Sequence, residues 1–142
     1  MKLILQRVFR ASVSVNEEEV SRFLKSKGFE IVECEKYSIP QISWIMSRAE
    51  VVIGPHGAGM ANIAFCRQGA HVLELYSSHL SQEYWLFSKR NGLKYNALKC
   101  KNGKLQNVDV NLLDYKKNFF EINFDDIYVE IDSIEKCLKI AS

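Results

Sequence analysis

The chain has 142 residues, of which 47% are hydrophobic and 25% are charged, the composition of a single ordinary globular domain that can bury a core. Its formal net charge of +2 gives no electrostatic reason to expect a nucleic-acid partner or a membrane surface. We expect no transmembrane segment, because glycine and proline interrupt the longest uncharged run, and no signal peptide, because polar residues follow the apolar start at Gln6.

Strand and helix patterns alternate along the chain. In order, we predict a strand at 2–8, a helix at 16–27, a strand at 29–34, a helix at 38–49, a strand at 51–53, a helix that ends near residue 69, a strand at 71–76, a helix at 78–91, strands at 93–97 and 127–131, and a last helix from 132. Residues 99–118 break this rhythm, which leaves open a short hairpin or a loose excursion. Residues 119–124 are a candidate for a small extra strand.

The predicted helices carry start and stop signals. Asn16 and Ser38 are placed as N-caps, Glu19 forms a cap-like pair with Asn16, Pro40 suits a first helical turn, and Gly28 ends a helix. The helix side chains expected to be buried are Val20, Phe23, Leu24, Ile42, Ile45, Met46, Ala49, Leu80, Tyr84, Phe87, Ile134, Leu138 and Ala141. A further group at helical spacing is interpreted as core and not as a base-stacking platform: Trp44, Tyr84, Trp85 and Phe87.

The alternation predicts an α/β fold, a Rossmann-like doubly wound parallel sheet flanked by helices in a single domain that spans residues 1–142. In such sheets, ligands bind beyond the carboxyl ends of the strands, where the strand order reverses. If the first strand lies between the second and the third, this switch point falls beside residues 51–62. That strand order is an assumption.

A glycine loop follows the third predicted strand and is the leading candidate site. Residues 51–62 read VVIGPHGAGMAN: three β-formers, a turn that contains Gly57, Ala58 and Gly59, and then small residues that favour a helix. Glycine permits positive φ and close approach of a ligand, and the free N–H groups of a helix start favour phosphate. The alternative is a strand-to-helix turn that needs glycine only for steric reasons.

Five side chains near the predicted switch point could contact a ligand. His56 can donate a hydrogen bond to a phosphate or a leaving group, or be satisfied by backbone carbonyls within the turn. Arg7 and Arg10 match phosphate oxygens, unless they lie in a solvated loop. Asn62 either holds the loop or touches a ligand. Glu74 interrupts an apolar strand, where it either holds the hydroxyls of a ribose or sugar as a buried carboxylate or faces solvent.

The cysteines are scattered and show no metal-ligand spacing, which favours reduced thiols and a cytoplasmic location. They are Cys34, Cys66, Cys100 and Cys137. We expect no metal site, since the acidic pair at 125–126 lacks a third ligand, and no cofactor.

Together these segments resemble the C-terminal part of glycosyltransferase family 61. The resemblance is carried by the arginine-bearing first strand, by residues 16–20, 28–32, 49–62, 72–75 and 128–131, and by Phe65. Its most specific part is the GPHGAG loop followed by Asn62 and Phe65. Two departures are the sequence SVSV at 12–15, where members tend to have a second arginine, and the dipeptide at 67–68, where they tend to have proline.

The resemblance implies a GT-B fold of two Rossmann-like domains, of which this chain is the C-terminal half that holds the donor nucleotide. It implies transfer of xylose, N-acetylglucosamine or a related sugar, with inversion, from a UDP-sugar to a glycan or protein acceptor. The N-terminal domain, which supplies the acceptor site and usually the catalytic base, is not in this sequence. No residue here is identified as that base.

We therefore predict a donor-binding glycosyltransferase domain that is incomplete without a missing N-terminal domain or a separate chain. The residues expected to bind the nucleotide sugar are Arg7, Arg10, His56, Gly57, Ala58, Gly59, Asn62 and Glu74. Loop amides, His56 and an arginine would neutralise the UDP leaving group without a required metal ion. The alternatives are a non-catalytic nucleotide- or phosphate-binding module and a degenerate remnant that binds nothing.

Overall fold

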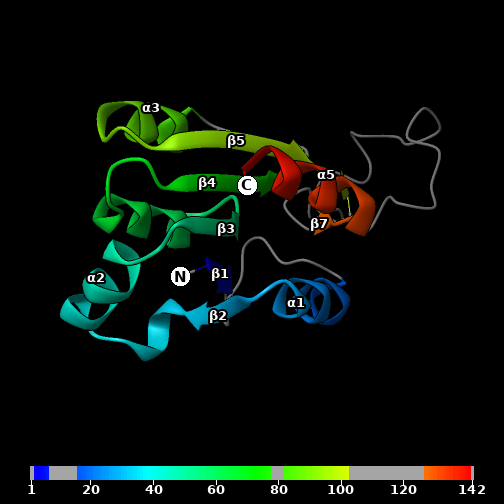
Figure 1. Ribbon diagram of the computed structural model, residues 1–142, viewed down its shortest axis with the longest axis horizontal. Helices are drawn as coiled ribbons and strands as arrows, with labels where there is room; N and C mark the ends of the chain where they lie inside the picture. Colours follow the sequence, from blue (N-terminus) through cyan, green and yellow to red (C-terminus); the bar gives the residue numbers. More distant parts are fainter. Residues whose placement is uncertain (1, 7–15, 78–81, 103–126, 142) are drawn as a thin grey trace, which may run out of the picture.

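The computed structural model describes residues 2–6, 16–77, 82–102 and 127–141 (Figure 1). The predictions for Arg7, Arg10, Leu80 and residues 119–124, and most of those for residues 99–118, lie outside these ranges. None of the helices within the described ranges is long and apolar enough to cross a lipid bilayer.

Five parallel strands form the central sheet in the order β2-β1-β3-β4-β5 (Figure 1). They are β1 Lys2–Gln6, β2 Phe29–Glu33, β3 Val51–Pro55, β4 His71–Tyr76 and β5 Lys94–Lys99. The first strand therefore lies between the second and the third, which confirms the assumed order. The parallel sheet flanked by helices confirms the α/β class and is compatible with a Rossmann-like fold.

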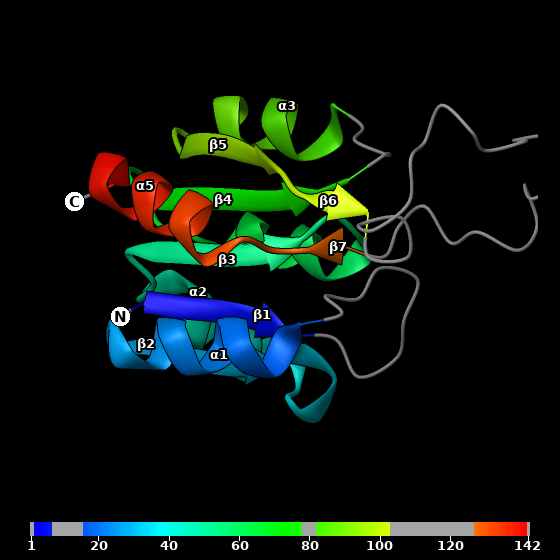
Figure 2. The same ribbon diagram turned by 90° about the vertical axis from the view of Figure 1, so that its right-hand side faces the viewer.

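Helices cover the sheet from both sides. They are α1 Glu17–Ser26, η1 Cys34–Lys36, α2 Ile39–Ser47, η2 Ala58–Phe65, α3 Glu83–Arg90 and α5 Ile131–Ala141, of which η1 and η2 are 3₁₀ helices. Figure 2 shows α1 and α5 in front of the sheet and α2 behind it. Among the described residues, this layered arrangement forms two hydrophobic cores, one on each face of the sheet.

The two cores divide the side chains of the central strands between them. Val52 and Val72 pack with α2, η2 and α3, whereas Ile53 and Leu73 pack with α1 and α5. Successive side chains of a strand point to opposite faces, so an uninterrupted apolar strand such as β3 can contribute to both cores. The uniformly apolar pattern of residues 51–53 thus indicated its position correctly.

The two predicted N-caps differ in the structure. Ser38 forms a full capping box with Gln41, as its hydroxyl accepts from the Gln41 N–H and its own N–H donates to the Gln41 side chain. Asn16 occupies the N-cap position of α1, but its side-chain amide instead bonds the backbone of Val129. The predicted N-cap position of Asn16 and its pair with Glu19, an Nδ2–Oε2 contact of 3.3 Å, are confirmed. Its side chain does not cap a backbone N–H of α1, because Oδ1 accepts from Val129 instead.

The end of the chain also departs from the prediction. Residues 127–131 are not a sixth strand of the main sheet: β7 Ile127–Tyr128 pairs antiparallel with β6 Lys101–Asn102 in a separate two-stranded sheet. Val129 and Glu130 lie between β7 and α5, which begins at Ile131. Val129 is fully buried and packs in the core on the α1 side, although it belongs to no strand.

Several aromatic side chains predicted to be core are exposed. Trp44 is 56% exposed and Trp85 is 40% exposed, and Phe87 also faces outward. In α3 the buried positions are Tyr84 and Ser88, one turn apart, so the neighbouring aromatic rings are directed to the flanks. Of this group only Tyr84 is in the core.

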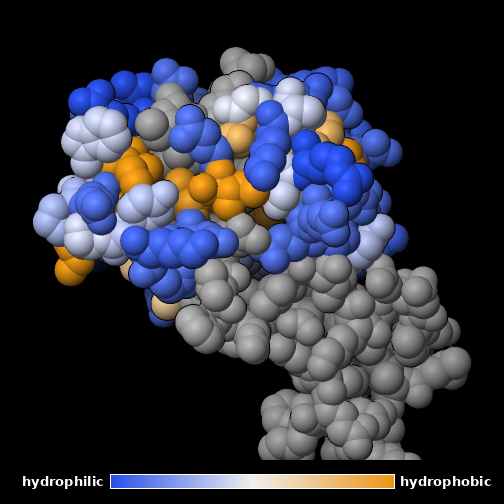
Figure 3. Space-filling view, turned by 90° about the horizontal axis from the view of Figure 1, so that it is seen from below, coloured by the Kyte–Doolittle hydropathy of each residue, from blue (hydrophilic) through white to orange (hydrophobic). Residues whose placement is uncertain are grey.

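A shallow apolar cavity of about 360 Å³ lies against α2. Its lining residues are Tyr37, Pro40, Gln41, Trp44 and Ile45. Figure 3 shows the molecule from below: hydrophobic surface is gathered in the half that carries α2 and β2, while the α1 half is mostly hydrophilic. The guanidinium of Arg48 covers one face of the Trp44 ring at 4.4 Å from its centroid.

Candidate functional site

The glycine loop lies at the carboxyl end of β3, in the middle of the sheet. Strand β3 is flanked by β1 and β4, and the chain reverses its direction of strand placement between β1 and β3. Residues 56–59 therefore follow the sheet at its switch point, where parallel α/β sheets bind ligands. The sequence predicted this location on the assumed strand order, which the structure confirms.

The loop backbone needs glycine at one position. Gly57 has φ 153° and ψ −179°, a conformation that is essentially restricted to glycine. Gly59 is not among the glycines with positive φ. The conformational argument made for the glycines of this loop therefore holds for Gly57 and not for Gly59.

The residues after the loop form a 3₁₀ helix and not the α-helix expected. The Met60 N–H donates to the Gly57 carbonyl at 3.0 Å, three residues back, and η2 ends at Phe65, before Gly69. The Asn62 side-chain amide donates to the Gly59 carbonyl at 3.0 Å, which draws that carbonyl away from the α-helical ladder. Asn62 thus holds the loop, one of the two roles considered for it.

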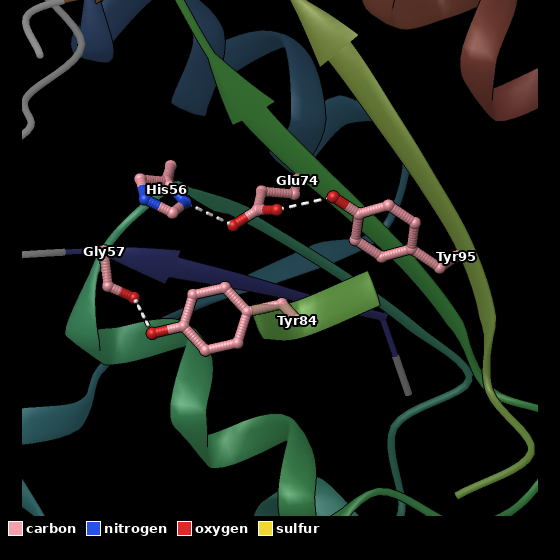
Figure 4. Close-up of polar contacts among 5 residues, drawn as sticks. All are labelled: His56, Gly57, Glu74, Tyr84 and Tyr95. Atoms are coloured by element: carbon pink, nitrogen blue, oxygen red, sulfur yellow. Dashed lines mark hydrogen bonds and ion pairs between the residues drawn. The ribbon is translucent and has the colours of Figure 1, made fainter. Parts of the chain in front are cut away.

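His56, Glu74 and Tyr95 form a chain of hydrogen bonds that begins at the loop and crosses β4 to β5 (Figure 4). Nδ1 of His56 lies 2.8 Å from Oε2 of Glu74, and the Tyr95 hydroxyl donates to Oε1 of Glu74 at 2.5 Å. The Glu74 side chain is fully buried, and that of His56 is 13% exposed. Of the two alternatives considered for Glu74, the one in which its side chain faces solvent is therefore wrong.

Tyr84 supports the loop from α3. Its hydroxyl donates to the Gly57 carbonyl at 2.7 Å, and its ring meets the His56 ring edge-on with centroids 5.9 Å apart (Figure 4). The backbone N–H of His56 donates to the Leu75 carbonyl at 2.7 Å, which continues the pairing of β3 with β4 past Pro55. Backbone and side chain of His56 are thus both held.

The electrostatics keep Tyr95 a hydrogen-bond donor. Burial, together with the hydrogen bond to Glu74 and its negative charge, raises the pKa of the Tyr95 phenol far above its usual value. The phenol therefore stays protonated at neutral pH and donates to the carboxylate. A buried carboxylate requires such partners, because an unpaired buried charge is strongly unfavourable.

The structure brings five predicted site residues into one loop and sets a sixth below it. His56, Gly57, Ala58, Gly59 and Asn62 lie between the end of β3 and the first turns of η2, and Glu74 lies on β4. Arg7 follows β1 directly in the sequence, but it and Arg10 lie outside the described residues.

The sequence-based reasoning missed Tyr95 and assigned Tyr84 only to the core. Strand periodicity alone did not indicate Tyr95; its contact with Glu74 follows from the pairing register of β4 and β5. Glu74 pairs with Ala97 across β4 and β5, so Tyr95, two residues earlier, lies on the same face of the sheet as Glu74. No comparable pattern indicated that the Tyr84 hydroxyl reaches the loop.

Within the described ranges, no group of three or more His, Cys, Asp or Glu side chains could hold a metal ion. All four cysteines lie in these ranges and are free thiols. The polar groups gathered at the loop are hydrogen-bonding groups, and what they can offer a ligand is an imidazole, backbone N–H groups and a shaped glycine backbone.

Fold and loop together define an α/β protein with a parallel sheet and a glycine loop at the switch point, a common setting for nucleotide sites. Residues 2–73 match the family Glycosyltransferase 61. The match covers just over half of the 142 residues, and the chain belongs to this family of glycosyltransferases. No curated protein matches the chain.

The matched segment runs from β1 into β4 and includes the whole glycine loop. It ends one residue before Glu74, so Glu74, Tyr84 and Tyr95 lie beyond it. The structure connects these three residues to the matched loop through hydrogen bonds and ring contact.

Proposed function

We propose that the chain binds a UDP-sugar donor at the glycine loop and takes part in inverting transfer of its sugar to a glycan or protein acceptor. The observation that carries this proposal is the glycine loop at the switch point with His56 held in it by a buried carboxylate. Family membership supplies the class of reaction.

In this proposal the loop neutralises the leaving diphosphate. Backbone N–H groups at residues 57–59 and the imidazole of His56 would donate to phosphate oxygens, and Arg7 or Arg10 would add a charge-assisted hydrogen bond. Donors fixed in advance at the place where charge develops lower the barrier without reorganisation. No metal ion is required in this scheme.

We further propose that these residues form the donor-binding half of a GT-B enzyme and that another domain or chain positions the acceptor. Positioning of two substrates supplies much of an enzymatic rate, and one Rossmann-like domain offers only one of the two sites. Two rival functions remain as alternatives. A non-catalytic nucleotide-binding module would bind UDP but take part in no sugar transfer, and a remnant without a ligand would not bind UDP.

Calorimetry with UDP and with uridine tests the site. We expect UDP to bind and uridine to bind more weakly, because the loop contacts the phosphates. His56→Asn should weaken UDP about tenfold, since a charge-assisted hydrogen bond is worth about 1.5–3 kcal/mol, and the asparagine amide replaces Nδ1 but not Nε2. Arg7→Ala or Arg10→Ala should weaken UDP to a similar extent, and uridine should respond to none of the three.

Arg22→Ala is the matched control, because Arg22 lies on α1 in an exposed ion pair with Glu18. It should leave UDP affinity unchanged, as exposed charges away from a ligand are screened. UDP affinity equal to that of the wild type in His56→Asn, Arg7→Ala and Arg10→Ala alike would move the site away from this loop.

A further inference from the structure

The Glu74 carboxylate is fully engaged inside the protein. It is 0% exposed, its Oε2 meets His56 at 2.8 Å, and its Oε1 accepts from Tyr95 at 2.5 Å. A carboxylate that binds ribose hydroxyls must present an oxygen to the ligand, and neither oxygen of Glu74 reaches the surface. The role of a direct donor contact, expected from the position of Glu74 in the sequence, does not suit this geometry.

The same contacts define which nitrogen of His56 carries a proton. The Tyr95 hydroxyl is a donor, so Glu74 accepts there, and a carboxylate that accepts at both oxygens requires N–H at Nδ1 of His56. A hydrogen bond from this ring to a phosphate must then be made through Nε2. The Tyr84 ring, on α3, lies edge-on to the His56 ring with centroids 5.9 Å apart and restricts rotation of the imidazole.

We propose that Glu74 is a positioning residue, which keeps a proton on Nδ1 of His56 and directs Nε2 to the ligand, and that it does not itself contact the donor. Tyr95 donates to the other oxygen of the same carboxylate. The proposal rests on the proposed function for the identity of the ligand, whereas the protonation of Nδ1 is a property of the free protein.

The protonation of Nδ1 can be read by nuclear magnetic resonance. The chain has three histidines, so ¹⁵N-histidine labelling with long-range ¹H–¹⁵N spectra gives three ring patterns, and His56→Asn identifies the one that belongs to His56. We expect the neutral His56 ring to carry its proton on Nδ1 and to leave Nε2 unprotonated, because Nδ1 faces a carboxylate oxygen that can only accept. A wild-type ring that loses the Nδ1 proton and keeps the Nε2 proton overturns the proposal without any variant.

Two near-isosteric variants separate the carboxylate from its support. In Glu74→Gln, the Tyr95 hydroxyl turns the amide oxygen toward itself, so the amide N–H₂ faces Nδ1 and the His56 proton should move to Nε2. Tyr95→Phe leaves the His56–Glu74 contact in place and should retain the Nδ1 proton. Retention of the Nδ1 proton in folded Glu74→Gln would show that the carboxylate does not set the tautomer.

UDP titration then distinguishes positioning from direct contact. Glu74→Gln should weaken UDP about tenfold in the wild-type background and cause no further loss in the His56→Asn background, because Glu74 acts through that ring. A ribose contact predicts the opposite: loss in both backgrounds and weaker uridine binding. If the wild type binds no UDP, the proposed function fails, while the resonance spectra still decide the role of Glu74.

Discussion

At the scale of single residues, Gly57 is the position where the loop depends most on residue type. Its φ of 153° and ψ of −179° lie in a region that other residues adopt only at a cost of about 1–3 kcal/mol. Its carbonyl also accepts the Tyr84 hydroxyl, so a change of backbone conformation breaks a contact to α3. The conformation of the loop and its attachment to the domain are therefore coupled.

We expect Gly57→Ala to lower the free energy of unfolding by about 1–3 kcal/mol and to weaken UDP tenfold or more, because the loop must leave its present conformation. Urea unfolding and calorimetry measure the two effects. Gly59→Ala is the control in the same loop: with no positive φ at Gly59, its stability cost should be clearly smaller. Equal stability losses in the two variants would contradict this explanation.

The sequence predicted most members of the candidate site but not how they contact one another. His56 and the glycines are recognisable because they interrupt an apolar strand–loop pattern, and Glu74 because a charge within an apolar strand needs a partner. Which partner it takes depends on the lateral order of strands, since His56 lies at the end of β3 and Tyr95 on β5. Local sequence carries no direct record of that order.

At the scale of elements, the two helix starts show the same difference between local contacts, which the sequence predicts, and contacts between distant segments, which it does not. The capping box of α2 is local, with Ser38 and Gln41 three residues apart, and it was predictable from the position of Ser38. Asn16 has a similar local appearance before α1, but its partner Val129 is more than a hundred residues away along the chain. There the predicted local pair of Asn16 with Glu19 is joined by a tertiary contact, which the local sequence did not indicate.

The Asn16 side chain joins the start of α1 to the segment between β7 and α5. Its Nδ2 donates to the Val129 carbonyl at 2.7 Å, and its Oδ1 accepts from the Val129 N–H at 3.0 Å. Only an amide can serve both groups, because aspartate lacks the donor. Asn16 thus connects the two helices that cover one face of the sheet.

This contact predicts different effects of aspartate at the two helix starts. At Asn16, aspartate places a carboxylate oxygen against the Val129 carbonyl, and we expect Asn16→Asp to lose about 1–2 kcal/mol of unfolding free energy. Ser38→Asp, at a true side-chain cap, should be nearly neutral, because serine and aspartate cap comparably. Urea unfolding compares them; a neutral Asn16→Asp would mean that Asn16 acts as an ordinary cap.

At the scale of the whole molecule, titratable groups are built into both hydrophobic cores. Cys66 and Tyr95 pack against the core on the α2 side, and Cys100 packs against the core on the α1 side. Burial raises the pKa of the Cys66 thiol from 9.0 to about 11 and that of the Cys100 thiol to about 12. The pKa of the Tyr95 phenol is raised as well. Folding therefore holds protons that the unfolded chain releases earlier.

These raised pKa values predict an alkaline limit of stability. Below about pH 9 the thiols are protonated in both states and contribute no pH dependence. Between about pH 9 and about pH 11 the unfolded chain loses these protons while the fold keeps them, so the free energy of unfolding falls as pH rises. Urea unfolding at about pH 8 and about pH 10 should show this decrease in the wild type.

Replacement of the thiols isolates their share of the effect. The double variant Cys66→Ala/Cys100→Ala removes two of the groups and should show a shallower decrease between the same two pH values, whatever its stability at pH 8. Cys137→Ala is the single-thiol comparison at the edge of the α1-side core: burial raises this thiol's pKa as well, so the variant should reduce the decrease by the share of one group and not of two. A double variant with the full wild-type decrease would assign the alkaline limit to Tyr95, and not to the buried thiols.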